Sequence, residues 1–132
     1  MQLFPGMRAL LEELGRSRLL AIATGKSRRG LDRALEASGM QAYFSASRCA
    51  DETQPKPHPA MLLELLEELE VARDAALMVG DTSHDLEMAR AAGVDAIAVT
   101  YGAHPESGLR ACEPRACVSS VLELREWLTL NG

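Results

Sequence analysis

Short runs of apolar residues alternate along this chain with segments in which apolar residues recur at helical spacing. Continuous runs at residues 19–23 and 75–79 are typical of strands buried on both faces, residues 95–99 are expected to form a further strand, and residues 43–47 a weaker one. Amphipathic helices are expected around residues 7–14, 27–39, 62–69, 86–92 and 120–128. Strands that alternate with helices over short connections form right-handed crossovers. The pattern therefore predicts an α/β fold with a mostly parallel sheet and helices on both faces.

The ends of several predicted helices carry recognisable signals. Ser27 precedes the second helix as an N-cap, and Gly39 follows it as a C-terminal stop. Gly93 ends the fourth helix in the same way. Ser120 and Glu123 have the spacing of a capping box, which marks the start of the last helix.

The length and charge of the chain limit what it can be. No repeat, low-complexity tract or linker interrupts residues 1–132, so we expect a single domain, with residues 102–114 as a surface loop. The net charge is -5 and the lysines and arginines form no stripe, which argues against nucleic acid or anionic lipid as a partner. The longest strongly apolar run, residues 19–23, is too short to cross a bilayer, and the N-terminus lacks the regions of a signal peptide. We therefore expect a soluble, cytoplasmic protein.

The cysteines are not spaced as a disulfide framework or as a metal site. Cys49, Cys112 and Cys117 form neither an even set nor a C-x-x-C pair. We expect reduced thiols without a redox or metal role.

Polar residues suited to phosphate and metal chemistry follow three of the predicted strands. Thr24 and Gly25 come directly after the run at residues 19–23, and Lys56 lies in the loop after the predicted strand at 43–47. Asp81 and Asp85 follow the run at residues 75–79. In open parallel sheets, ligands bind beyond the carboxyl ends of the strands. We therefore expect these side chains to lie along one edge of the sheet.

Asp81 and Asp85 are one helical turn apart, which brings two carboxylates into one small volume. At an effective dielectric of about 20, two charges about 4 to 5 Å apart cost roughly 3 to 4 kcal/mol, and a divalent cation such as Mg²⁺ would offset this repulsion. The alternative is that Thr82 and Asp85 form a capping box at the start of the next helix. The spacing alone leaves both interpretations open.

Two further positions have a functional and a structural interpretation. Thr24 offers a hydroxyl, and the adjacent backbone offers N–H groups, at a strand-to-helix turn that suits phosphate oxygens. The alternative is that Thr24 and Ser27 are turn and cap residues, with Gly25 in an unusual backbone conformation. Lys56 lies between two prolines, which stiffen its backbone so that the ammonium could be aimed at a phosphate. The alternative for Lys56 is a solvated loop lysine.

In their order and spacing, the segments A-T-G-K, K-P-H-P and M-V-G-D-T-S-H-D-L-E-M-A-x-x-A-G resemble the haloacid dehalogenase (HAD) superfamily. The likeness covers nearly the whole chain, is strongest for the phosphoglycolate-phosphatase-like branch, and implies a Rossmann-like core. By this resemblance Thr24 and Gly25 bind the transferring phosphoryl group. Lys56 neutralises phosphoryl charge and steadies the nucleophile. Asp81 ligates Mg²⁺, and Asp85 holds the metal directly or through water.

The chain also departs from the pattern of that family. Family members begin with a strand that ends in D-x-D-G-T, whose first aspartate attacks phosphorus and whose second acts as acid and base; this sequence contains no such segment. The helical cap that selects substrates in this branch is also absent. The resemblance therefore implies a truncated core without a cap domain and with the first central strand missing. We do not expect the aspartyl-phosphate mechanism from this chain by itself.

The missing strand would stand between the runs at 19–23 and 75–79. With a spacing of about 4.8 Å per strand, its removal leaves these neighbours about 10 Å apart, each with an open apolar edge. We therefore expect the two strands to close up against each other, or to recruit a strand from a second copy or from a missing N-terminal segment.

These observations predict the core of a Mg²⁺-dependent phosphate monoester phosphatase that acts on a small phosphorylated metabolite, with activity doubtful in this chain alone because the nucleophilic aspartate is lacking. One alternative is a non-catalytic remnant that binds phosphate, metal or a partner chain and acts as a dimer. Another is a receiver-like signalling domain, which shares a parallel sheet and an acidic pocket, although the order of the motifs argues against it.

Overall fold

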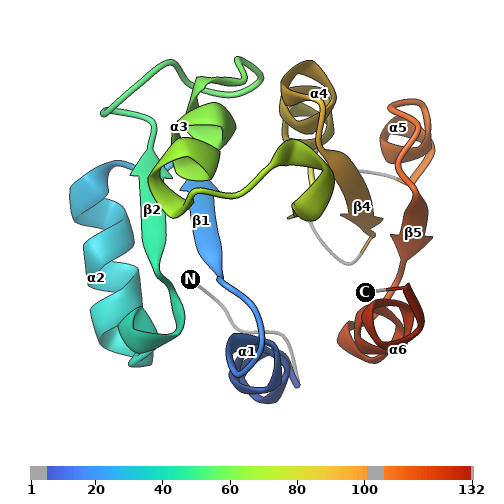
Figure 1. Ribbon diagram of the computed structural model, residues 1–132, viewed down its shortest axis with the longest axis horizontal. Helices are drawn as coiled ribbons and strands as arrows, with labels where there is room; N and C mark the ends of the chain where they lie inside the picture. The colour runs from blue at the N-terminus through green and yellow to red at the C-terminus, as the bar shows by residue number, and fades with distance from the viewer. Residues whose placement is uncertain (1–5, 101–105, 132) are drawn as a thin grey trace.

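The computed structural model describes residues 6–100 and 106–131, and helices alternate with strands along the chain (Figure 1). The strands are β1 (Ala21–Thr24), β2 (Ala46–Cys49), β3 (Leu77–Gly80), β4 (Asp95–Val99) and β5 (Ala116–Val118). The helices are α1 (Met7–Gly15), α2 (Arg28–Ser38), α3 (Ala60–Leu69), α4 (Ser83–Ala92), α5 (Glu106–Arg110) and α6 (Val121–Asn131). Short 3₁₀ turns, η1 and η2, lie at Gln41–Tyr43 and Arg73–Ala75. No helix of these two ranges is long and apolar enough to cross a membrane.

The strands form two parallel sheets. β1 pairs with β2, and β4 lies between β3 and β5. Helices α3 and α4 cover one face of the sheets, while α1 and α6 lie on the other (Figure 1). The prediction of an α/β fold with parallel strands and helices on both faces is therefore confirmed.

Strand β4 is the centre of the core because both of its faces are covered. Ala96 and Ala98 pack in the cluster under α3 and α4. Ile97 and Val99 pack in the cluster that α1, β5 and α6 share. Successive side chains of a strand point to opposite faces, so the covered part of β4, residues 96–99, is apolar at every position, while Asp95 at its start is exposed. This explains the continuous apolar run in the sequence.

Three strand boundaries differ from the prediction. β1 begins at Ala21 and not at residue 19, and Leu19 is 57% exposed. β2 begins at Ala46, directly opposite Ala21, and the turn η1 includes Tyr43, where the strand was expected to begin. β3 begins at Leu77 because η2 extends to Ala75. A 3₁₀ turn takes up part of the predicted strand in the last two cases, whereas Leu19 and Leu20 lie outside regular secondary structure.

The interpretation of residues 102–114 as a surface loop is wrong in part, since Glu106–Arg110 forms α5; residues 102–105 lie outside the described part of the chain. Leu109 is fully buried in the cluster that also contains α4, and this contact holds the short helix. The strand β5 was not predicted either. A helix with one buried side chain and a strand of three residues are too short to show a period.

The expectation that the strands at 19–23 and 75–79 close up against each other is wrong. Within the described residues β1 pairs with β2 alone, and β3 pairs with β4 alone. Helix α1 packs on both sheets, with Leu11 against the cluster of β2 and Leu10 in the cluster of β4. Helices α3 and α4 contact each other on the opposite face. These helices therefore bridge the two sheets.

Candidate functional site

The turn between β3 and α4 is built around a buried carboxylate. Asp85 is only 4% exposed and lies in the first turn of α4. Its Oδ2 accepts the backbone N–H groups of Asp81 and Thr82, at 3.2 and 3.3 Å. In return, Thr82 Oγ1 accepts the backbone N–H of Asp85 at 3.1 Å. The capping box that the sequence offered as an alternative is therefore present.

Gly80 lets the Asp85 side chain fold back over the end of β3. A Cβ atom at Gly80 would lie 2.4 Å from Cβ and 2.9 Å from Oδ2 of Asp85. The φ angle of Gly80 is not in the left-handed region, so the position requires glycine for space and not for its backbone conformation.

Lys56 joins the loop between β2 and α3 to the start of α4. Its Nζ donates to Oδ1 of Asp85, and the two form an ion pair. The Lys56 side chain is 18% exposed, so the interpretation of a solvated loop lysine is wrong. The ammonium is held at one place, and its contact with a phosphate remains a prediction.

The carboxylates of Asp81 and Asp85 differ in whether their oxygen atoms are already engaged by other residues. Both oxygens of Asp85 are engaged, one by Lys56 and the other by two backbone N–H groups. Asp81 is half-buried, and its carboxylate makes no salt bridge with any residue that the structure describes. Across these same residues, no group of three or more His, Cys, Asp and Glu side chains could hold a metal ion. A cation at this turn would therefore bind the carboxylate of Asp81, and its other ligands would come from solvent or substrate.

The turn after β1 carries the second predicted part of the site. Thr24 Oγ1 accepts the backbone N–H of Lys26 at 3.1 Å, which leaves the hydroxyl hydrogen available for donation. Ser27 caps α2 as predicted and accepts the backbone N–H of Gly30. Gly25 is exposed and its φ lies outside the left-handed region, so the proposed unusual conformation at Gly25 is wrong. The turn interpretation of Thr24 is confirmed, and its hydroxyl remains compatible with phosphate binding.

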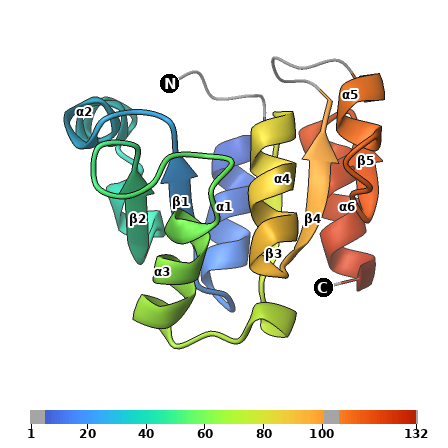
Figure 2. The same cartoon turned by 90° about the horizontal axis from the view of Figure 1, so that it is seen from above.

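The segments after β1, β2 and β3 meet at one end of the molecule (Figure 2). The backbone N–H of Ala50 donates to the carbonyl of Lys26 at 3.0 Å, which joins the loop after β2 to the turn after β1. Lys56, farther along the same loop, joins it to Asp85. The loop therefore connects the two other parts of the predicted site.

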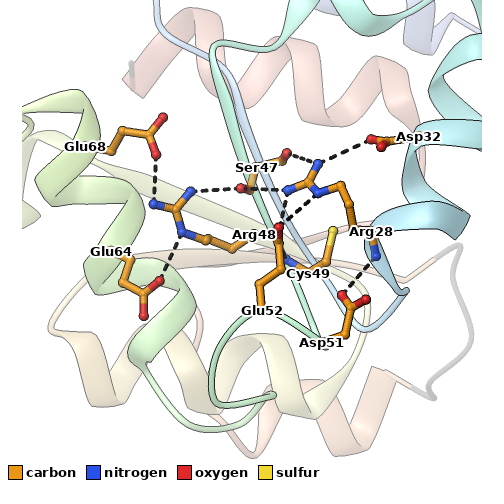
Figure 3. Close-up of polar contacts among 9 residues, drawn as sticks. All are labelled: Arg28, Asp32, Ser47, Arg48, Cys49, Asp51, Glu52, Glu64 and Glu68. Carbon is orange, nitrogen blue, oxygen red and sulfur yellow. Dashed lines mark hydrogen bonds and ion pairs between the residues drawn. The ribbon is translucent and has the colours of Figure 1, made fainter.

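A network of charged residues beside this site was not predicted from the sequence (Figure 3). Arg28 and Arg48 bind carboxylates of the loop after β2 and of α3, with Glu52, Glu64 and Glu68 as partners. The hydrogen bonds that Arg28 donates to the Glu52 carboxylate are the main cause that raises the pKa of Arg28, and they also lower the pKa of Glu52. The paired residues are up to 24 positions apart in the sequence, so no local pattern indicates them.

Cys49 lies at the end of β2 beside this network. It is completely buried, and burial is the main cause that raises the pKa of its thiol. A raised pKa keeps the sulfur protonated and weakly nucleophilic at neutral pH.

The fold and the site define an α/β domain of the Rossmann-like type, with its polar residues at the carboxyl ends of parallel strands. The family model of haloacid dehalogenase-like hydrolases matches residues 1–99. This chain therefore belongs to the haloacid dehalogenase-like hydrolase family.

Two similar proteins are named as phosphatases. The chain is 42% identical over 125 residues to "Probable phosphatase IndB" of Dickeya dadantii, a match that covers 92% of this chain and 54% of the relative. It is 32% identical over 132 residues to the phosphoglycolate phosphatase of Vibrio parahaemolyticus, covering 98% of this chain and 58% of that protein. The chain thus spans a little over half the length of these relatives.

Solved structures agree with this assignment. A haloacid dehalogenase-like family hydrolase from Streptococcus pneumoniae superimposes with a TM-score of 0.86 at 27% identity, covering 96% of this chain and 60% of that chain. A subfamily IA hydrolase of the same superfamily from Geobacter sulfurreducens gives a TM-score of 0.80 at 29% identity, with coverage of 97% and 60%. The resemblance to the HAD superfamily that the motifs suggested is therefore confirmed.

Proposed function

We propose that this chain forms the phosphate- and Mg²⁺-binding part of a phosphatase that acts on a small phosphorylated metabolite. The observation that carries the proposal is the ion pair between Lys56 and Asp85, which anchors a loop lysine near the open carboxylate of Asp81. Relatives named as a phosphatase and as a phosphoglycolate phosphatase support the same class of reaction.

The contacts of each residue suggest its role. A lysine ammonium has three donors, and Asp85 takes one from Lys56, so the others can meet phosphoryl oxygens. The hydroxyl of Thr24 and the backbone N–H of Gly25 would bind oxygens of the same group. Asp85, with both oxygens engaged, would position Lys56 and would not ligate the metal directly.

Asp81 is the residue of this chain that would hold Mg²⁺. Proteins usually bind Mg²⁺ through one or two carboxylates, together with waters and substrate phosphate oxygens. A half-buried carboxylate directly after β3 fits this requirement. When bound, the ion would neutralise negative charge on the phosphoryl group.

The group that attacks phosphorus is not among these residues, because the sequence has no D-x-D-G-T segment. We therefore propose that hydrolysis needs a further strand that carries a nucleophilic carboxylate beside β1 and β3. The facing edges of these two strands are unpaired within the described residues, so their backbone groups are available to such a strand.

The same edges favour a second candidate function. A chain that binds phosphate and pairs these edges with a second copy would be a non-catalytic dimer. Val79 on β3, which is an edge strand of its sheet, is 40% exposed, and this is consistent with a surface that another chain covers.

Calorimetric titration with inorganic phosphate, with and without Mg²⁺, tests the proposed function. We expect Mg²⁺ to tighten phosphate binding, and we expect Asp81→Asn to remove most of this effect. Each 1.4 kcal/mol of binding free energy that is lost weakens the affinity by about tenfold. Asp74→Asn is a matched control, since Asp74 is an exposed aspartate in the turn η2. We expect it to bind as the wild type does. We also expect no turnover of p-nitrophenyl phosphate by the 132-residue chain.

Phosphate binding that is indifferent to both Mg²⁺ and Asp81 would contradict the metal assignment. Metal-dependent turnover by the 132-residue chain would show that a nucleophile is present outside the D-x-D-G-T pattern. Binding without turnover by a protein that sediments as a dimer would favour the second candidate.

A further inference from the structure

Arg28 occupies a position where an arginine is locally unfavourable. It is the first residue of α2, which has no acidic residue in its first turn. The N-terminus of a helix carries a partial positive charge, so a cation there is disfavoured. Side chains that conflict with a local preference often have a role in tertiary structure or function.

The contacts of Arg28 show what that role is (Figure 3). Its guanidinium makes five hydrogen bonds, which equals the number of N–H donors that an arginine has. Two of them form a fork with the carboxylate of Glu52, at 3.1 and 2.8 Å. Two others reach the hydroxyl and carbonyl oxygens of Ser47 on β2, and the longest, 3.4 Å, reaches Asp32. A lysine could not reproduce this geometry.

These contacts join the turn that carries Thr24 to the loop that carries Lys56. The backbone N–H of Arg28 adds a bond to Asp51 at 2.9 Å, so consecutive residues of the loop, Asp51 and Glu52, are both fixed to the start of α2. Glu52 also accepts the backbone N–H of Cys49, which ties the fork to the end of β2. Farther along the loop, Thr53 donates to Glu64 of α3.

We infer that Arg28 is a positioning residue that sets the place of Lys56 relative to Thr24 and Gly25. Arg28 does not touch the proposed phosphate site itself; it acts through Glu52 and the loop. The inference rests on the proposed function for its ligand, although the mechanical link between Arg28 and Lys56 can be tested without a ligand.

The chain suits such a test because it has only two lysines, Lys26 and Lys56. Lys26 is exposed, whereas Lys56 is largely buried and paired. Amine acetylation of the folded protein, followed by mass spectrometry, gives the rate at each lysine, and Lys26 is the internal reference. In the wild type we expect Lys56 to react much more slowly than Lys26.

Arg28→Gln should raise the acetylation rate of Lys56 relative to that of Lys26 by about twofold to fivefold. This factor corresponds to the free energy that partly exposed ion pairs contribute. Glu52→Gln should act in the same direction, because its amide oxygen can still accept from Cys49 while the charged fork is lost. Combining the two should add little, since both remove one interaction. Arg125→Gln is the matched control, because it breaks an arginine–glutamate pair with Glu13 between α6 and α1.

A ratio of rates that stays at the wild-type value in both Arg28→Gln and Glu52→Gln would overturn the inference, and so would an equal rise in Arg125→Gln. The same assay with inorganic phosphate and Mg²⁺ keeps the two proposals apart. Phosphate that fails to protect Lys56 in the wild type would count against the proposed function, while a raised ratio in Arg28→Gln would still support the positioning role. If phosphate protects Lys56 in the wild type but Arg28→Gln leaves the ratio of acetylation rates unchanged, the proposed function is supported and the positioning role of Arg28 is contradicted.

Discussion

Replacing Asp85 by alanine is expected to lower the free energy of unfolding by about 3 to 5 kcal/mol, the range found when one partner of a buried ion pair is removed. The Asp85 side chain is 5% exposed and its partner Lys56 is 18% exposed, so water cannot fully replace the lost contact. The substitution also removes the acceptor for the N–H groups of Asp81 and Thr82. The ion pair, the helix cap and the loop therefore weaken together.

Urea unfolding followed by circular dichroism measures this effect. Asp85→Asn is expected to cost less, because the amide oxygen can still accept a backbone N–H while the charge is lost. Asp74→Ala, at an exposed position of η2, should stay within about 0.5 kcal/mol of the wild type. An Asp85→Ala protein as stable as the Asp74→Ala control would contradict the structural role given to this carboxylate.

Substituting Gly80 by alanine is expected to destabilise the protein by about 3 kcal/mol, at the upper end of the usual cost of overpacking. The new methyl group would lie 2.4 Å from Cβ of Asp85, closer than such atoms approach in proteins. Asp85 would have to move, and with it the contact to Lys56. The expected loss of stability therefore includes part of the loss that Asp85→Ala causes.

Gly25→Ala is the matched control for this substitution. Apart from Gly25 and its two chain neighbours, no residue has a heavy atom within 4 Å of a Cβ at Gly25, and the backbone there is outside the left-handed region. An alanine there should leave the stability unchanged or raise it by up to about 1 kcal/mol, because it restricts the unfolded chain. Equal losses of stability in the two variants would show that the packing of Asp85 against Gly80 has no special importance.

The alternation of apolar runs and amphipathic segments was sufficient to predict the α/β fold. It worked for β4 because residues 96–99, which are covered on both faces, are all apolar. It failed for α5 and β5, where a few residues such as Leu109 make the decisive contacts. It also could not show that β1 and β3 belong to separate sheets, with α1 packed on both.

For the candidate site, the sequence indicated individual residues but not the contacts between distant parts of the chain. The sequence indicated Thr24, Lys56 and the two aspartates, because residues after parallel strands share one edge of a sheet. The spacing left a metal ligand and a helix cap both open at Asp85, and it could not indicate the ion pair with Lys56, which is 29 residues away. The fork between Arg28 and Glu52 was missed for the same reason.

The central claim is that Thr24, Lys56 and Asp81 bind one phosphoryl group and one Mg²⁺ ion together. It can be tested most directly by nuclear magnetic resonance of the ¹⁵N-labelled chain during titration with inorganic phosphate in the presence of Mg²⁺. We expect the backbone amides of Gly25 and Asp81 and the ammonium of Lys56 to shift along a single binding curve. Signals that do not move, or that follow separate curves, would contradict the claim.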